Sequence, residues 1–150
     1  MFSQTVEYAL RAVVHLAMKA PEPQTTAMIS EATRVPVAYL SKVLQGLRAK
    51  EIVSLRRGIG GGVSLAHSPR ALSILDIVNA VEPIGRIKTC PLELKSHGKR
   101  LCSLHSRMDE SLAHMERAFS ATTLQELLED RNPSVPLCDK PNHSTHAHVD

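Results

Sequence analysis

The chain has 150 residues, enough for one domain with a buried core, and 43% hydrophobic and 22% charged residues make it an ordinary globular sequence. Aromatic residues contribute only 3%, which favours packed helices with an aliphatic core over a β-sandwich. No segment approaches the ~18–20 apolar residues needed to cross a bilayer, so a membrane-spanning helix is excluded. The formal net charge of +3 is small, and the distribution of charge therefore matters more than its total.

The N-terminal segment lacks the basic start, apolar run and small-residue cleavage site of a signal peptide. We therefore expect a cytoplasmic protein whose three cysteines stay reduced, since clustered cysteines in that compartment more often bind metal or sense redox state than form structural disulfides. The sequence contains no recognisable nucleophile–base pair and no nucleotide-binding loop. It predicts a protein that is not an enzyme and has no small-molecule substrate.

Residues 3–20 are predicted to form an amphipathic helix, because apolar residues recur at three- and four-residue spacing. Ser3 is the expected N-cap of this helix. Glu7 and Arg11 are spaced for an ion pair on its polar side. Prolines in residues 21–24 are expected to end it.

Residues 26–48 have the outline of a helix-turn-helix. Thr26 is expected to cap a short helix that buries Met28, Ile29 and Ala32, and a tight turn leads into a second helix that begins near Pro36. The apolar face of the second helix is expected to include Tyr39, and Val37 is expected to face outward. A helical hairpin packed in a core is the alternative. The residues predicted to contact a DNA major groove are Ala38, Tyr39, Ser41, Lys42, Gln45 and Arg48.

Residues 52–66 are predicted to form a β-hairpin with strands at 52–55 and 63–66 and a glycine-rich tip. Glycine runs also occur in phosphate-binding nucleotide loops, but no Lys-Ser/Thr follows here and the next element is a strand, which excludes that interpretation. A hairpin directly after a helix-turn-helix is a wing. Its predicted DNA contacts are Arg56, Arg57, Gly60 and Gly61.

Positive charge is concentrated in the helix-turn-helix and the hairpin. From Arg34 to Arg70 there are seven lysines and arginines and a single carboxylate, Glu51, so the rest of the chain is net acidic. Charge segregated in this way is the electrostatic footprint of nucleic-acid binding, and a merely solvated basic face is the weaker interpretation.

The C-terminal half is predicted to be helical on both sides of a loop. Residues 73–81 form a short helix in which Asp76 completes a capping arrangement on Ser73, and Thr123 with Glu126 caps a last helix. Residues 103–119 form a long helix whose apolar stripe most simply packs against its own copy in a dimer. This stripe consists of Leu104, Met108, Leu112, Met115 and Phe119.

From residue 131 onward the chain is predicted to be a mobile tail, because prolines are frequent and apolar residues few. A solvated tail is favoured over metal binding by its histidines. The cysteine and histidines of the tail are Cys138, His143, His146 and His148.

Residues 90–105 gather four soft metal ligands, namely Cys90, His97, Cys102 and His105. Thiolates and imidazoles at short spacing serve zinc, iron–sulfur clusters or thiol redox chemistry. The spacing of the two cysteines differs from that of zinc fingers, which pair ligands two to four residues apart. Cysteines in an ordinary connection between helices are the alternative.

The order helix, helix-turn-helix, glycine-rich hairpin, short helix, cysteine loop and long helix resembles the Rrf-two (Rrf2) family of winged helix-turn-helix transcriptional regulators, the IscR- and NsrR-like proteins. The resemblance runs from residue 1 to about residue 129, and its most specific segments are EYALRA, AYLSKVLQGL, RRGIGGGVSL and ILDIVNAVEP. It implies a homodimer that binds a palindromic operator in double-stranded DNA, usually as a repressor. Several members carry a [2Fe–2S] cluster.

The family's cluster pattern contains three cysteines. Cys90 and Cys102 match the first and third, His105 matches the histidine found after the last, and Ser96 stands where the middle cysteine is expected. Some members recruit a carboxylate from the partner's first helix, which Glu7 matches. The resemblance therefore implies a cluster held by Cys90, Cys102, His105 and Glu7 in trans. His97 beside the missing cysteine, or a thiol pair without a cluster, are the other two arrangements.

The sequence thus predicts a mainly α-helical protein with a small β-hairpin wing and four parts: a winged helix-turn-helix DNA-binding region (1–82), a cysteine-containing sensor loop (83–105), a dimerisation helix with a final short helix (106–130), and a disordered tail (131–150). The predicted function is that of a homodimeric, sequence-specific DNA-binding regulator controlled by a [2Fe–2S] cluster or by thiol redox state. The alternatives from other classes are a small iron–sulfur redox protein and a winged-helix protein-interaction module.

Overall fold

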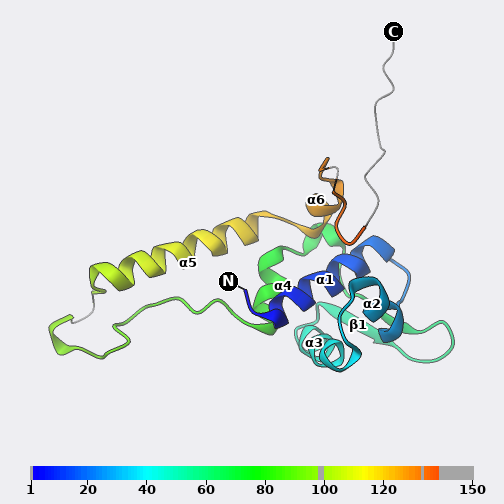
Figure 1. Ribbon diagram of the computed structural model, residues 1–150, viewed down its shortest axis with the longest axis horizontal. Coiled ribbons are helices and arrows are strands. Elements are labelled where there is room, and N and C mark those ends of the chain that lie inside the picture. The colour runs from blue at the N-terminus through cyan, green and yellow to red at the C-terminus, as the bar shows by residue number, and fades with distance from the viewer. Residues whose placement is uncertain (1, 98–99, 133, 139–150) are drawn as a thin grey trace, which may run out of the picture.

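Helix α1 (Gln4–Lys19) forms the centre of the fold (Figure 1). The structure is a computed structural model that describes residues 2–97, 100–132 and 134–138. Small side chains on α1, including Ala9 and Ala12, are completely buried and allow neighbouring helices to approach closely. As predicted, Ser3 caps α1, accepting a hydrogen bond from the backbone N–H of Val6. The helices in contact with α1 are α2 (Thr26–Thr33), α3 (Val37–Ala49), α4 (Ile74–Val81) and α6 (Leu124–Glu129).

The core of this helical body is aliphatic, as the scarcity of aromatic residues predicts. Five helices contribute to it, and burial of their apolar side chains supplies the main favourable contribution to folding. The largest fully buried side chains in these helices are Leu16, Ile29, Leu40, Leu47, Ile77 and Leu124.

Helices α2 and α3 form the predicted helix-turn-helix. The N-cap of α2 is Thr25, one residue before the expected Thr26, because the Thr25 side chain accepts from the backbone N–H of Met28. The prediction that Met28 and Ala32 are buried is wrong, since both are exposed. With only eight residues, α2 turns a narrow face to the core, and Ile29 occupies it.

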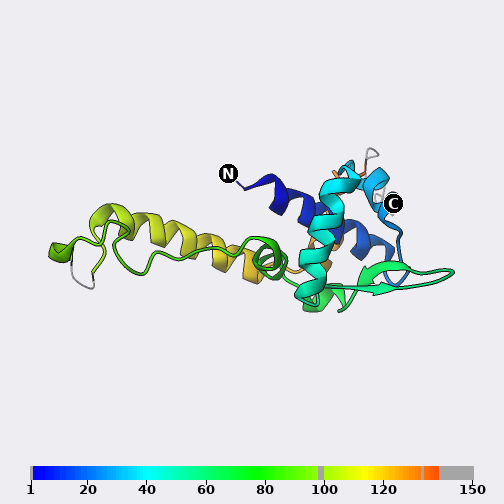
Figure 2. The same ribbon diagram turned by 90° about the horizontal axis from the view of Figure 1, so that it is seen from below.

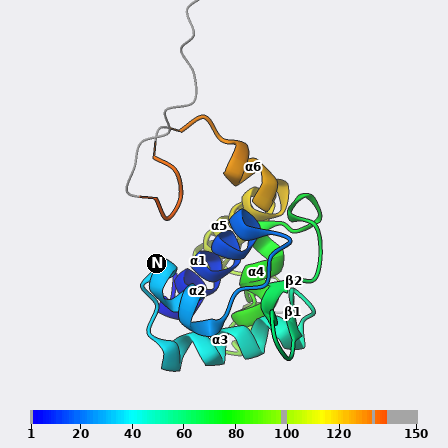
Figure 3. The same ribbon diagram turned by 90° about the vertical axis from the view of Figure 1, so that its right-hand side faces the viewer.

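The hairpin pairs β1 (Val53–Arg56) with β2 (Gly62–Leu65) in antiparallel register. A third segment joins it, because Gln24 and Val63 exchange two backbone hydrogen bonds of 2.8 Å. Glycine is required at position 62: its φ is +147°, and a Cβ there would lie 2.6 Å from the Gln24 carbonyl oxygen. Figure 3 shows the hairpin beside α3 on one side of the helical body.

Helix α5 (Ser103–Ala121) extends away from the helical body, and the tip of the hairpin protrudes in the opposite direction (Figures 1 and 2). After α5 the chain returns to the body, where Ser73 and Thr123 form an isolated antiparallel bridge. These two residues are also the N-caps of α4 and α6, and both helices have the predicted capping boxes. The bridge therefore anchors the C-terminal end of α5.

Within the described residues, no helix has both the length and the apolar character needed to span a membrane. The three histidines of the predicted tail lie outside the described residues.

Candidate nucleic-acid interface and sensor loop

Helix α3 has one buried apolar face and one exposed polar face. The apolar face packs into the core through Leu40, Val43, Leu44 and Leu47. Burial of this face fixes the rotation of the helix, which leaves the other face in solvent. Every residue of α3 predicted to contact DNA is exposed: Ala38, Tyr39, Ser41, Lys42, Gln45 and Arg48.

Tyr39 is 57% exposed, so its predicted place on the apolar face of α3 is wrong. Its ring makes an edge contact with Tyr8 of α1, with ring centroids 6.0 Å apart. The guanidinium carbon of Arg11 lies 6.0 Å from the centroid of the Tyr8 ring. The Tyr39 ring thus covers Tyr8 at the rim of the core, where its hydroxyl group can remain hydrated.

The wing places two arginines and a narrow glycine tip beside α3. Arg56 is exposed at the end of β1, and Arg57 is exposed directly before the glycine tip. The Gly61 N–H donates to the Gly58 carbonyl at 3.0 Å, which closes the tip. A Cβ at Gly61 would lie 2.2 Å from the Arg56 carbonyl oxygen, so a side chain cannot be accommodated there without moving the backbone.

A groove runs between α3 and the hairpin, with polar groups along it and aliphatic side chains beneath. In the part of the chain that the structure describes, none of the ion pairs involves Lys42, Arg48, Arg56 or Arg57. These cations are therefore free to pair with phosphates. The residues that line the groove are Thr26, Ser41, Leu44, Gln45, Arg48, Val53, Ser54, Leu55 and Val63.

The sensor loop holds its four soft ligands as two pairs. The Cys90 sulfur is buried and lies 3.3 Å from Nδ1 of His97. The Cys102 sulfur, at the N-cap of α5, lies 3.3 Å from Nδ1 of His105. Both cysteines are free thiols. Each thiol thus lies within hydrogen-bonding distance of an imidazole nitrogen.

The donor chemistry of these pairs fits an iron–sulfur centre, since thiolates and imidazoles both ligate iron in such clusters. The arrangement in the described residues does not assemble a site, because no three His, Cys, Asp or Glu side chains come together there. Glu7, the expected fourth ligand, pairs with Arg11 at 2.9 Å. Ser96, at the position of the missing cysteine, is exposed.

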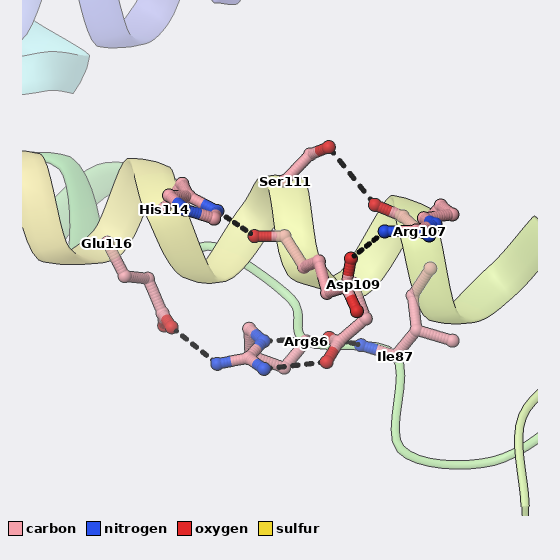
Figure 4. A network of polar contacts seen from close by, with 8 residues as sticks. Arg86, Ile87, Arg107, Asp109, Ser111, His114 and Glu116 are labelled. Carbon is pink, nitrogen blue, oxygen red and sulfur yellow. Dashed lines mark hydrogen bonds and ion pairs between the residues drawn. The ribbon is translucent and has the colours of Figure 1, made fainter.

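A network of polar contacts ties the start of the sensor loop to α5 (Figure 4). Arg86 binds Asp109 through two hydrogen bonds and Glu116 through a third of 3.0 Å. Asp109 also accepts from the backbone N–H of Ile87 at 2.8 Å. The Arg86 hydrogen bonds lower the pKa of Asp109 to about 2, and the backbone donor acts in the same direction. The carboxylate therefore remains charged across the physiological pH range.

No sequence pattern predicts this network, because Arg86 and Asp109 are 23 residues apart and belong to different elements. The same holds for the contact between Tyr8 and Tyr39 and for the pairing of Gln24 with the wing. By contrast, the ion pair between Glu7 and Arg11 was predicted from their spacing and is confirmed.

A helix-turn-helix followed by a two-stranded wing, with the exposed face of α3 next to a basic hairpin, defines the DNA-binding fold of winged-helix transcriptional regulators. The chain belongs to the Rrf2 family of iron-dependent transcriptional regulators, whose family model matches residues 2–130. The resemblance stated from the sequence is thereby confirmed.

Individual relatives agree with this assignment. The transcriptional regulator NsrR of Geobacillus kaustophilus is 30% identical over 131 residues, which cover 83% of this chain and 87% of that protein. IscR of T. potens has a similar structure, with a TM-score of 0.73, 23% identity and coverage of 87% of both chains. CymR, the global cysteine regulator of B. subtilis, has a TM-score of 0.70 and 23% identity, with 85% of this chain and 95% of that chain covered.

Proposed function

We propose that the protein is a homodimeric, sequence-specific repressor of transcription that binds a palindromic operator in double-stranded DNA. The observation that carries this proposal is the exposed polar face of α3 beside a hairpin whose arginines have no carboxylate partner among the described residues. The α3 face suits a major groove, where hydrogen-bonding side chains distinguish base pairs.

The proposed DNA contacts divide into two groups with different roles. On α3, Ser41 and Gln45 are suited to base edges, while Lys42 and Arg48 are suited to phosphates. On the wing, Arg56 and Arg57 reach the minor groove or its phosphates. Three further proposed contacts have a small side chain or none, which lets the backbone come close to the DNA: Ala38, Gly60 and Gly61. Tyr39, held by Tyr8, completes the proposed set.

The proposed dimer forms through α5. Leu104 and Met108 are exposed on the part of the helix that extends beyond the body, with exposed fractions of 65% and 48%. The same stripe continues into Leu112 and Met115, which line a hollow against α1 and α4. A second copy of the helix covers the exposed half of the stripe. Two-fold symmetry then separates the operator half-sites by about one helical turn or a multiple of it.

The proposed division of the chain follows from these roles. Residues 1–82 bind DNA, residues 83–105 sense a signal, and residues 106–130 dimerise and return the chain to the body. Residues 131–150 form a tail, most of which lies outside the described residues.

Control of DNA affinity is assigned to the pairs Cys90–His97 and Cys102–His105. The proposed states of this loop are a [2Fe–2S] cluster, ligated by Cys90, Cys102 and His105 with Glu7 of the partner or His97, and a thiol pair without a cluster. A bound cluster supplies a centre that responds to redox conditions. The family's description as iron-dependent supports the first state, and the two free thiols, each in contact with an imidazole nitrogen, support the second. In both states of the loop, a change at the thiols shifts the equilibrium of the dimer between a geometry that binds DNA and one that does not.

DNA binding is tested by selecting bound sequences from a randomised duplex library and measuring affinity for the selected site at several salt concentrations. Wild type is expected to select a palindrome. Arg56→Ala and Arg57→Ala are each expected to weaken binding and to reduce the salt slope by about one. Glu22→Ala, on the exposed segment after α1, is the control and leaves both unchanged. Wild type that selects no sequence, with a salt-independent affinity, contradicts the proposal.

Control by the loop is tested by anaerobic purification, followed by visible absorption and by iron and sulfide analysis of wild type and Cys102→Ala. The cluster state predicts coloured wild-type protein and a pale variant. A colourless and iron-free wild type after anaerobic reconstitution eliminates the cluster and leaves the thiol state. That state in turn requires DNA affinity to differ between the reduced and the oxidised protein.

A further inference from the structure

The tip of the wing carries a single side chain. Residues 58–62 read Gly-Ile-Gly-Gly-Gly, so Ile59 alone has atoms beyond Cα, and it is completely exposed, with a relative exposure of 106%. Turn tips normally carry Gly, Pro, Asn, Asp or Ser, each of which favours the turn itself. A β-branched aliphatic residue has no such role in the turn. Its exposed surface is therefore available to a binding partner.

The backbone makes the tip slender and presents Ile59 at its outermost point. The hydrogen bond from Gly61 to Gly58 closes a four-residue turn, and Gly60 has a φ of +72°, as a type II turn requires at its third position. Ile59 occupies the second position of that turn. A Cβ added at Gly58 or Gly60 would meet no atom within 4 Å, so no other described part of the chain lies close to the residues on either side of Ile59.

The flanking charges select the partner. Arg56 and Arg57 directly precede the tip, and a narrow ridge flanked by arginines is complementary to a narrow groove walled by phosphates. The minor groove of B-DNA is about 6 Å wide, which excludes a bulky loop but admits a glycine ridge with one side chain. The hairpin lies beside α3 (Figure 3). When α3 binds in the major groove of DNA, the tip therefore lies near the adjacent minor groove.

We propose that Ile59 enters the minor groove and selects sequence there by excluding the 2-amino group of guanine. The proposal rests on the DNA-binding function proposed above. Guanine places this donor in the minor groove, whereas A·T pairs present only acceptors. The side chain of Ile59 cannot accept a hydrogen bond, so an amino group beneath it loses its water without replacement. The tip thus prefers A·T pairs at positions where Arg56 and Arg57 contact the backbone without distinguishing bases.

The test compares wild type, Ile59→Ala and Ile59→Val in selections from a randomised duplex library. Wild type and Ile59→Val are expected to select A·T pairs at the positions under the wing, and Ile59→Ala is expected to lose this preference while retaining the bases read by α3. On the site selected by wild type, Ile59→Ala is expected to bind about five- to tenfold more weakly. Its salt slope stays that of wild type, in contrast to Arg57→Ala, because no ionic contact is removed.

Inosine gives the decisive measurement, since it is guanine without the 2-amino group. Replacing the A·T pairs under the wing by G·C is expected to weaken wild-type binding, and replacing them by inosine·C is expected to restore it; Ile59→Ala should bind all three duplexes equally. Ile59 has no packing role, so unchanged thermal unfolding confirms that the variants fold. If Ile59→Ala matches wild type on every duplex, the role of Ile59 is refuted while DNA binding stands. Wild type that binds no duplex refutes both proposals.

Discussion

Arg86 and Asp109 join the start of the sensor loop to α5 through two charge-assisted hydrogen bonds, of 2.7 Å from Nε to Oδ1 and 2.6 Å from Nη2 to Oδ2. Arg86 lies four residues before Cys90, and Asp109 lies seven residues after Cys102. The ion pair therefore closes the base of the segment that contains both cysteines. Bidentate pairs of this kind fix geometry more firmly than single ion pairs.

Asp109→Asn is expected to loosen the start of the sensor loop, because the amide loses the charge and one of the acceptor oxygens that hold Arg86 and the Ile87 N–H. Trypsin cleavage at Lys88 and Lys95, both exposed, is expected to become about three- to tenfold faster under native conditions. Glu110→Gln is the matched control, since among the described residues Glu110 forms its ion pair with the more exposed Arg107. Equal cleavage rates in the two variants would show that the Arg86–Asp109 pair does not order the loop.

His15 is expected to make stability depend on pH. Burial lowers its pKa below the ordinary value, the hydrogen bond with Gln24 opposes this, and the charge of Lys19 adds to it. The folded state therefore resists protonation at a pH where the unfolded chain already accepts a proton. The stability that the neutral, buried His15 contributes is complete above the pKa of about 6.5 that His15 has in the unfolded chain. It is lost as the pH falls from there toward the lower pKa of His15 in the folded state.

The measurement is the unfolding temperature at pH 7.5 and pH 5.5 for wild type and His15→Gln, which retains a hydrogen-bonding partner for Gln24. The decrease on acidification is expected to be smaller in His15→Gln, by on the order of a few degrees. His67→Gln, at an exposed position, should keep the wild-type decrease. An identical decrease in all three proteins would contradict the role of His15.

Gly62→Ala is expected to lower the free energy of unfolding by about 2 kcal/mol. Its φ of +147° disfavours any side chain, and the new Cβ would meet the backbone of Gln24. The pairing of Gln24 with Val63 would then be displaced, which weakens the attachment of the wing to the body. Urea unfolding measures the change. Gly85→Ala is the control, because a Cβ there has no neighbour within 4 Å, and a loss of similar size in that variant would rule out the steric explanation.

Leu104→Gln is expected to weaken the proposed dimer about tenfold, because it removes apolar area from the exposed half of the α5 stripe. Sedimentation equilibrium measures the dissociation constant. Arg117→Gln is the control, since Arg117 is exposed on the opposite side of α5. A Leu104→Gln protein with unchanged self-association would exclude this stripe from the interface.

Local spacing and residue type were sufficient to predict the elements, with ends that differ from the observed ones by one residue at α2 and at both strands. Ser73 with Asp76 and Thr123 with Glu126 form the expected capping boxes, and the residues of α3 predicted to face outward are exposed. Such features depend on residues three or four positions apart, so the sequence contains all the information they need. The sequence motifs also predicted the family, and the match of the Rrf2 family model to residues 2–130 confirms that prediction.

The two wrong burial predictions have different causes, one in the length of a helix and one in a residue distant in sequence. Met28 has helical spacing for burial, but the short α2 offers the core only a narrow face, and Met28 remains in solvent. Tyr39 is exposed because Tyr8, from another helix, provides the surface on which its ring rests.

By itself, the sequence determined the winged helix-turn-helix, its basic character and the positions of the thiols, because hydrophobic periodicity, glycine and charge act locally. Only the tertiary structure decided that Cys90 pairs with His97 and which residues close the sensor loop. Contacts such as that between Arg86 and Asp109 arise when packing brings distant segments together, and no local pattern encodes them.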